Sequence, residues 1–217
     1  MWNALVISFW LGLGAAPQLA NLAAQFVALA IFTTWVVLDR RRWDLGLGRP
    51  SNARAIRAIV PLVAVVLALN IKQAAFVELA PAALLSAAVA ACWEELAFRG
   101  VLMGRLLPSG RLAAAWISSI GFGLLHTSQP DLGAAALSAL ITTGLGLSLA
   151  ALRLATGSIW PPVIAHLIVN LSASATVGAL PAAQTPFALE PLLVGAYFLA
   201  YGAFLLNFPA PETNAED

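Results

Sequence analysis

Three ionisable residues lie close together inside a strongly hydrophobic stretch of this chain. Glu94, Glu95 and Arg99 occur in the run Pro81–Leu107, which reads PAALLSAAVAACWEELAFRGVLMGRLL. Near the centre of a bilayer, each ionisable side chain costs about 2.5–3.5 kcal/mol to insert. Because of this cost such groups need partners, and their presence in an apolar segment indicates a functional site.

The two histidines of the chain, His126 and His166, also fall in hydrophobic segments. Phe122 precedes His126 by four residues, and Asn170 follows His166 by four. Residues at this spacing lie on the same face of a helix. The segments therefore present an aromatic ring with one imidazole and a carboxamide with the other.

The same spacing links Glu95 to Arg99, which can pair along one helix face, whereas Glu94 is rotated by about 100° and can point elsewhere. At about 1.5 Å per residue, Glu94 lies roughly 16 Å from the basic end of its segment. His126 lies roughly 20 Å and His166 roughly 12 Å from the corresponding ends of theirs. We therefore expect the three groups to converge from three helices.

These residue types permit hydrolysis. A carboxylate shielded from bulk water can act as a general base on a bound water molecule, and a neighbouring imidazole can share the proton. A histidine and an amide on another helix can donate hydrogen bonds to a developing oxyanion. Alternatively, Glu94, His126 and His166 supply the His₂Glu ligand set of catalytic zinc sites. The residues alone leave both chemistries open.

Each residue also has a structural interpretation. Taken alone, Glu95 and Arg99 are more typical of a buried ion pair that orients a helix. Either histidine alone fits a hydrogen-bonded core imidazole, and Asn170 alone fits a contact between helices. Cys92 is interpreted as a packing residue rather than a nucleophile, because no basic group stands at helical spacing from it. The joint pattern favours catalysis.

Composition assigns the chain to the integral membrane proteins. Of 217 residues, 61% are hydrophobic and 10% are charged, against about 25% charged in soluble domains. The single cysteine excludes an intrachain disulfide or a thiolate metal cluster. No basic stripe with interleaved aromatic residues indicates nucleic acid. We expect one integral membrane domain over residues 1–217 and no separate soluble domain.

The apolar runs divide into about eight membrane segments, an all-α polytopic bundle around a polar cavity. The first is the shortest, and the fourth carries the two glutamates. The segments are Ala4–Ala16, Leu19–Leu38, Ala58–Ala75, Pro81–Leu107, Leu112–Thr127, Leu132–Leu152, Ser158–Val177 and Leu189–Phe208.

Basic residues support this division. If the segments alternate across the membrane, nine arginines fall on one side, only Lys72 falls on the other, and Arg99 lies within the membrane. The side rich in arginine is predicted to be cytoplasmic, with both termini on it. The nine arginines are Arg40, Arg41, Arg42, Arg49, Arg54, Arg57, Arg105, Arg111 and Arg153.

Three motifs carry a family resemblance. WEELAFRG contains Glu94, Glu95 and Arg99, GFGLLH ends at His126, and IAHLIVN contains His166 and Asn170. In order and spacing they resemble the CPBP family of intramembrane proteases, also called the Abi or CAAX prenyl protease 2 (Rce1-like) family. The resemblance covers a core at about residues 81–172.

The resemblance implies an intramembrane endopeptidase that acts on a membrane-associated protein or peptide, in CAAX-type processing or in bacteriocin-related maturation and immunity. It implies that Glu94 activates water with His126, while His166 and Asn170 hold the oxyanion. Glu95 and Arg99 would support Glu94, and Phe122 would accompany His126. The family carries a metalloprotease label, but the ligand set fits zinc and a metal-free, glutamate-activated water equally well.

Two other classes of function stay open. One is a non-enzymatic membrane protein for immunity or partner binding that keeps the fold. The other is a proton-coupled transporter that uses the carboxylates and imidazoles as a relay, although the sequence shows no internal repeat of the kind common in transporters. In all cases the expected location is a bacterial-type cell membrane, with the lipid bilayer and a membrane-associated peptide as partners.

Overall fold

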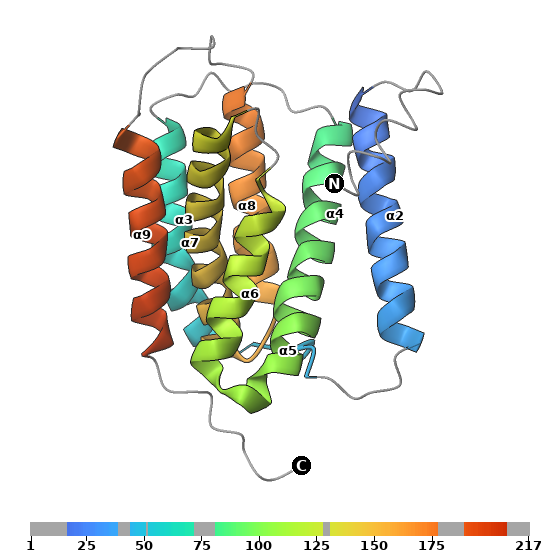
Figure 1. The fold of residues 1–217 in the computed structure, drawn as a ribbon, viewed down its shortest axis with the longest axis vertical. Helices are drawn as coiled ribbons and strands as arrows, with labels where there is room; N and C mark the ends of the chain where they lie inside the picture. Colours follow the sequence, from blue (N-terminus) through green and yellow to red (C-terminus); the bar gives the residue numbers. More distant parts are fainter. Residues whose placement is uncertain are drawn as a thin grey trace.

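The structure, a computed structural model, describes residues 17–38, 44–50, 52–71, 81–127, 131–177 and 189–207. Within these ranges every regular element is a helix, which confirms the predicted all-α class. The long helices run side by side as a bundle (Figure 1). The predicted first segment, Ala4–Ala16, lies outside the described residues.

The helices coincide with the segments predicted from hydropathy after the first one, with small differences at their ends. Helix α3 begins before the predicted Ala58, because hydropathy marks the apolar part of a helix and not its polar first turns. Helix α7 continues past the predicted Leu152 and ends at Thr156. The cap residue is Gly157, whose φ of 70° is the left-handed conformation that suits glycine. The main helices are α2 (Pro17–Leu38), α3 (Asn52–Ile71), α4 (Pro81–Glu95), α6 (Arg111–Leu125), α7 (Leu132–Thr156), α8 (Trp160–Val177) and α9 (Leu189–Leu206).

The predicted segment Pro81–Leu107 is not a uniform α-helix. After Glu95 it changes to a π-helix, η1 (Leu96–Leu102), and then to the short helices α5 (Met103–Leu106) and η2 (Leu107–Ser109). A π-helical turn widens the backbone and is frequent at functional sites. Ser118 on α6 donates its hydroxyl to the Phe98 carbonyl at 3.0 Å, so the neighbouring helix supports this widened turn.

Two helices of the described residues are long and apolar enough to cross a membrane by themselves, over Leu19–Leu38 and Leu132–Thr156. Shorter apolar helices cover Ile56–Val65, Arg111–Leu125 and Leu192–Leu206. Length and composition therefore do not establish eight spans, and that number stays a prediction.

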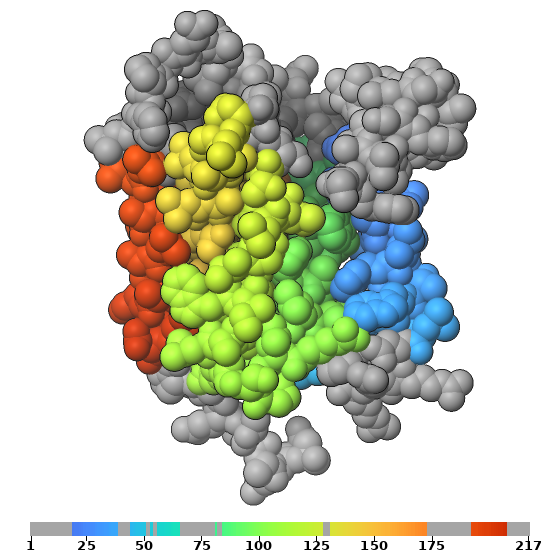
Figure 2. All heavy atoms as spheres, in the orientation of Figure 1, coloured from blue at the N-terminus to red at the C-terminus, as the bar shows by residue number. Residues whose placement is uncertain are grey.

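The outer face of the bundle is rich in exposed apolar side chains. Figure 2 shows α6 in the middle of one face, between α9 and α4. Exposed apolar surface on this scale marks contact with a membrane or a partner. On α6 the large exposed side chains are Leu112, Trp116, Ile117, Ile120, Leu124 and Leu125.

The segment of residues 44–50 packs against the turn between α7 and α8. Arg153 Nη2 lies 2.9 Å from Asp44 Oδ1, and the Ile159 amide donates to the Gly46 carbonyl at 2.8 Å. Gly46 has φ +66°, and a Cβ there would meet the Arg153 guanidinium, so both conformation and space require glycine. The Trp160 indole also donates to the Leu47 carbonyl. Asp44, Arg153 and Trp160 therefore lie together at one end of the bundle.

Helix α9 contacts α3 at a proline. Pro61 lies inside α3, where it supplies no backbone N–H and disturbs the hydrogen bonding of the preceding turn. Tyr197 donates its hydroxyl to the Pro61 carbonyl at 2.9 Å, and Tyr201 donates to the Ala58 carbonyl. The two phenol rings are stacked on each other, so they hold α9 against the irregular part of α3.

Helices α6 and α7 approach closely at Gly123. A Cβ at this position would lie 2.6 Å from the Ala139 carbonyl oxygen and would clash with the Thr143 side chain. Gly121 has more room: a Cβ there would lie 3.4 Å from the Phe98 ring. Close packing between these two helices therefore depends on Gly123.

We expect Gly123→Ala to destabilise the protein by about 1–3 kcal/mol, the usual cost of overpacking. Gly121→Ala is the matched control, and it should be neutral or stabilising because alanine favours the helix by about 1 kcal/mol. Thermal unfolding of both variants in detergent measures the difference. Equal melting temperatures would contradict this account of the α6–α7 contact.

Candidate active site

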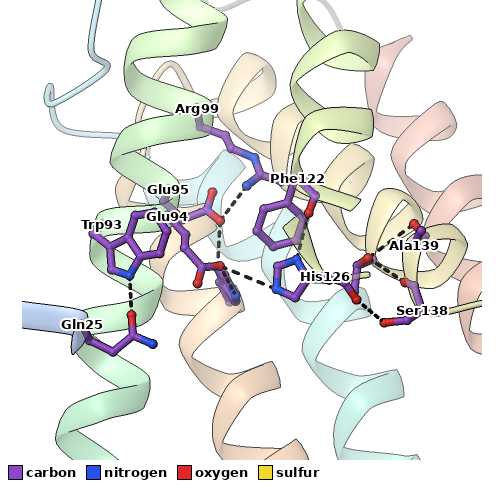
Figure 3. Close-up of polar contacts among 11 residues, drawn as sticks. Gln25, Trp93, Glu94, Glu95, Arg99, Phe122, His126, Ser138 and Ala139 are labelled. Carbon is purple, nitrogen blue, oxygen red and sulfur yellow. Dashed lines mark hydrogen bonds and ion pairs between the residues drawn. The ribbon is translucent and has the colours of Figure 1, made fainter. Parts of the chain in front are cut away.

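Glu94 faces both histidines of the chain. Its Oε2 atom lies 3.7 Å from His166 Nε2 on α8 and 3.9 Å from Nε2 of His126, which directly follows α6 (Figure 3). The predicted convergence of the three groups is therefore confirmed. Glu94 and His166 are buried, and no described residue donates a hydrogen bond to Glu94 Oε2.

Glu95 lies beside the same imidazole but contacts its other nitrogen. His166 Nδ1 and Glu95 Oε1 are 2.9 Å apart, and both side chains are buried. The sequence motif suggested that Glu95 and Arg99 support Glu94. In the structure Glu95 lies between Arg99 and the His166 imidazole.

Arg99 holds Glu95 from the opposite side. Its Nη1 donates to Glu95 Oε1 at 2.9 Å, which confirms the ion pair expected from the i,i+4 spacing. Its Nη2 donates to the Gly146 carbonyl on α7 at 2.9 Å. The guanidinium carbon also lies 4.4 Å from the centre of the Phe122 ring, within cation–π range. Arg99 thus connects η1 to α6 and α7 while it fixes the Glu95 carboxylate.

His126 closes the end of α6 with its own side chain. In a continuing helix the Phe122 carbonyl would accept from the His126 amide, but that amide donates to the Gly123 carbonyl instead. His126 Nδ1 lies 2.8 Å from the Phe122 carbonyl oxygen, which can only accept, so Nδ1 carries the proton. The same geometry leaves Nε2 of the neutral ring as an acceptor towards Glu94.

The backbone of His126 is held by α7. Ser138 donates its hydroxyl to the His126 carbonyl at 2.8 Å, and Thr142 donates to the Ser138 carbonyl at 2.6 Å. Phe122 packs on both imidazoles, with ring centres 4.6 Å from His126 and 5.4 Å from His166. Sequence reasoning had paired Phe122 with His126 but had no signal for Ser138.

Access to the site differs among its members. The side chain of His126 is 32% exposed, whereas those of Glu94 and His166 are 9% and 3% exposed. His126 is therefore the most accessible of the three side chains.

Asn170 lies on α8 one helical turn after His166 and is half-buried, so it shares the helix that carries His166. Cys92 is a partly buried free thiol on α4. Trp93, next to Glu94, donates its indole N–H to Gln25 on α2, and Asn21 donates to Ser86. These two contacts attach α2 to the helix that bears the glutamates.

A metal was the second candidate chemistry for Glu94, His126 and His166. No group of three or more His, Cys, Asp or Glu residues in the described ranges is arranged as a metal site. The separations of 3.7 and 3.9 Å also exceed the roughly 3.4 Å between ligand atoms of a tetrahedral zinc ion bound at about 2.1 Å. In the structure the three side chains are therefore spaced more widely than the ligands of an ideal tetrahedral zinc site.

Comparison with known proteins supports the interpretation of the motifs. Residues 76–172 match the family model described as "Type II CAAX prenyl endopeptidase Rce1-like". The matched region contains both glutamates, Arg99, both histidines and Asn170.

A protein of Bacillus subtilis (strain 168), named "Putative membrane peptidase YdiL", is 27% identical over 144 residues. The alignment covers 65% of this chain, and the chain spans half of that protein's length. No solved structure matches the chain. The match over residues 76–172, together with the three motifs, supports assignment of this core to the CPBP family of Rce1-like membrane proteases.

Proposed function

We propose that the protein is an intramembrane endopeptidase that hydrolyses a peptide bond of a membrane-associated protein or peptide. The observation that carries this proposal is the convergence of Glu94 Oε2 with two imidazole Nε2 atoms at 3.7 and 3.9 Å. These distances exceed a direct hydrogen bond, and a water molecule about 2.8 Å from both Glu94 Oε2 and His126 Nε2 fits between those two atoms.

In the proposed reaction, Glu94 and His126 activate this water. The Glu94 carboxylate takes a proton from the water, and the oxygen attacks the carbonyl carbon of the scissile bond. His126 Nε2 faces the same carboxylate oxygen and, as an acceptor, orients the second hydrogen of the water. Burial of Glu94 keeps bulk water away from the base, while the half-buried His126 remains partly accessible.

His166 and Asn170 are proposed to stabilise the tetrahedral intermediate. Asn170 carries an amide that can donate to the oxyanion. It lies on α8, as His166 does, so one helix carries both groups. When the bond between carbon and nitrogen breaks, the leaving amine takes up the proton that the water released. This assigns all four predicted catalytic residues, Glu94, His126, His166 and Asn170, to one hydrolytic step.

A comparison of membrane peptides tests this function. We expect cells with the wild-type protein to contain cleavage products that are absent when His166 is replaced by asparagine. The asparagine amide can still donate to Glu95, so this change removes mainly the Nε2 atom. Mass spectrometry of membrane fractions from the two strains identifies the cleaved bond and the class of substrate.

Three results would decide between the alternatives. Identical peptide profiles would overturn the peptidase proposal. Proton flux in proteoliposomes that is lost in the same variant, without any cleavage, would indicate a transporter. Loss of cleavage on addition of a chelator would reinstate a metal at this site.

A further inference from the structure

Glu95 accepts two hydrogen bonds on a single oxygen atom. Both Arg99 Nη1 and His166 Nδ1 lie 2.9 Å from Glu95 Oε1, and all three side chains are buried. The arginine is always a donor, because its guanidinium is not deprotonated in proteins. Glu95 Oε1 is therefore an acceptor, and the atom that shares it, His166 Nδ1, must carry a proton.

This fixes the resting form of His166. A neutral imidazole with a proton on Nδ1 has a lone pair on Nε2. His126 is held in the same form by a different group, the Phe122 carbonyl. While both rings are neutral, Glu94 Oε2 faces two acceptor nitrogens.

We propose that Glu95 is a positioning residue that keeps His166 in the Nδ1–H form, so that His166 first accepts a proton and only then acts as a donor. The inference rests on the proposed hydrolysis and specifies its order of proton transfers. A neutral His166 of this form cannot donate from Nε2 to an oxyanion. It becomes a donor at Nε2 only after a proton has arrived there.

The proton balance of the reaction then closes without another group. An O–H bond of the water breaks, its proton passes through the Glu94 carboxylate to His166 Nε2, and the oxygen bonds to the carbonyl carbon. The new Nε2–H donates to the oxyanion, beside the Asn170 amide. On collapse the bond from carbon to nitrogen breaks, and the same proton moves to the leaving nitrogen.

Arg99 has a defined part in this arrangement. By donating to Glu95 Oε1 and to the Gly146 carbonyl, it connects the Glu95 carboxylate to the backbone of α7. Glu95 and Arg99 therefore act on the reaction through the orientation and protonation of His166.

Nitrogen NMR of histidine tests the proposal directly, because the chain contains two histidines. Protein labelled with ¹⁵N-histidine gives two rings, and the His166→Asn variant assigns them. In the wild type we expect both rings to carry the proton on Nδ1. A resting His166 with a proton on Nε2 would overturn the proposal.

Two variants then distinguish the effect of the hydrogen-bond acceptor at Glu95 from the effect of its charge. In Glu95→Gln the amide oxygen can still accept from both donors, so His166 should remain in the Nδ1–H form. The double variant Glu95→Leu with Arg99→Met removes the acceptor without leaving a buried charge, which protects folding. There His166 should shift its proton to Nε2, towards Glu94, while the His126 signals stay unchanged.

Kinetics provides the second measurement. In the double variant kcat should fall by up to about 10⁴-fold, the loss seen when a catalytic histidine is held in the wrong tautomer, and KM should change less than threefold. Glu95→Gln should retain more activity than the double variant. Ser86→Ala, on the same helix but in contact with Asn21, is the control that leaves kcat unchanged.

The outcomes distinguish this inference from the proposed function. If the wild-type protein cleaves no peptide, hydrolysis fails as a function, and the NMR spectra still decide the form of His166. If cleavage occurs but His166 keeps its Nδ1 proton in the double variant, Glu95 is not its positioning residue.

Discussion

Replacement of Glu94 by glutamine is expected to lower kcat for peptide cleavage by about 10²–10⁴-fold, the contribution typical of a positioned general base. Glutamine has nearly the same shape, so packing on α4 should persist, but its amide cannot take a proton from water. Glu94 Oε2 is the atom that both Nε2 atoms face, and thus its loss removes the common acceptor. Cleavage of a reconstituted membrane peptide measures the effect.

Stability should respond differently from activity in this variant. A buried carboxylate that receives no hydrogen bond on Oε2 from the described residues contributes little to folding, so Glu94→Gln should be as stable as the wild type or more stable. Gln25→Leu, which removes the partner of Trp93 outside the site, is the control for nonspecific loss of activity. Activity within tenfold of the wild type would remove Glu94 from the proposed role.

Replacement of Arg99 alone by methionine should destabilise the protein by about 3–5 kcal/mol, because it leaves the Glu95 carboxylate buried without its cationic partner. The Gly146 carbonyl also loses a donor, and the Phe122 ring loses its cation–π contact. Chemical unfolding in detergent, followed by circular dichroism, measures this loss.

The double variant of Glu95→Leu and Arg99→Met provides the matched control for that loss. Because it replaces a buried ion pair by apolar side chains, most of the lost stability should return, although activity should not. If the single Arg99→Met variant were as stable as the double variant, the guanidinium would not be the partner on which the buried carboxylate depends.

Much of the fold could be predicted from hydropathy and spacing. Apolar runs located the helices from α2 to α9, since burial in a bundle or a bilayer demands them. The i,i+4 rule predicted the contact of Glu95 with Arg99, which depends only on local geometry. Depth along each helix predicted that Glu94, His126 and His166 would converge.

The parts that could not be predicted depend on backbone detail or on contacts between distant helices. The change to a π-helix after Glu95 leaves no trace in a pattern of apolar residues. The contact of Glu95 with His166 requires the rotation of α4 relative to α8, which sequence does not fix. The role of Ser138 was missed for the same reason, because a lone serine on an apolar helix carries no signal of its partner.

The pair of stacked phenols on α9 offers an internal optical probe. Tyr197 and Tyr201 are the only tyrosines of the chain, and both bond to α3 next to Pro61. Tyrosine absorbance and resonance Raman bands therefore report on this contact between α9 and α3, separately from the tryptophans. In the variants described above, unchanged phenol bands would show that an activity change originates at the carboxylates and imidazoles and not in a general loosening of the bundle.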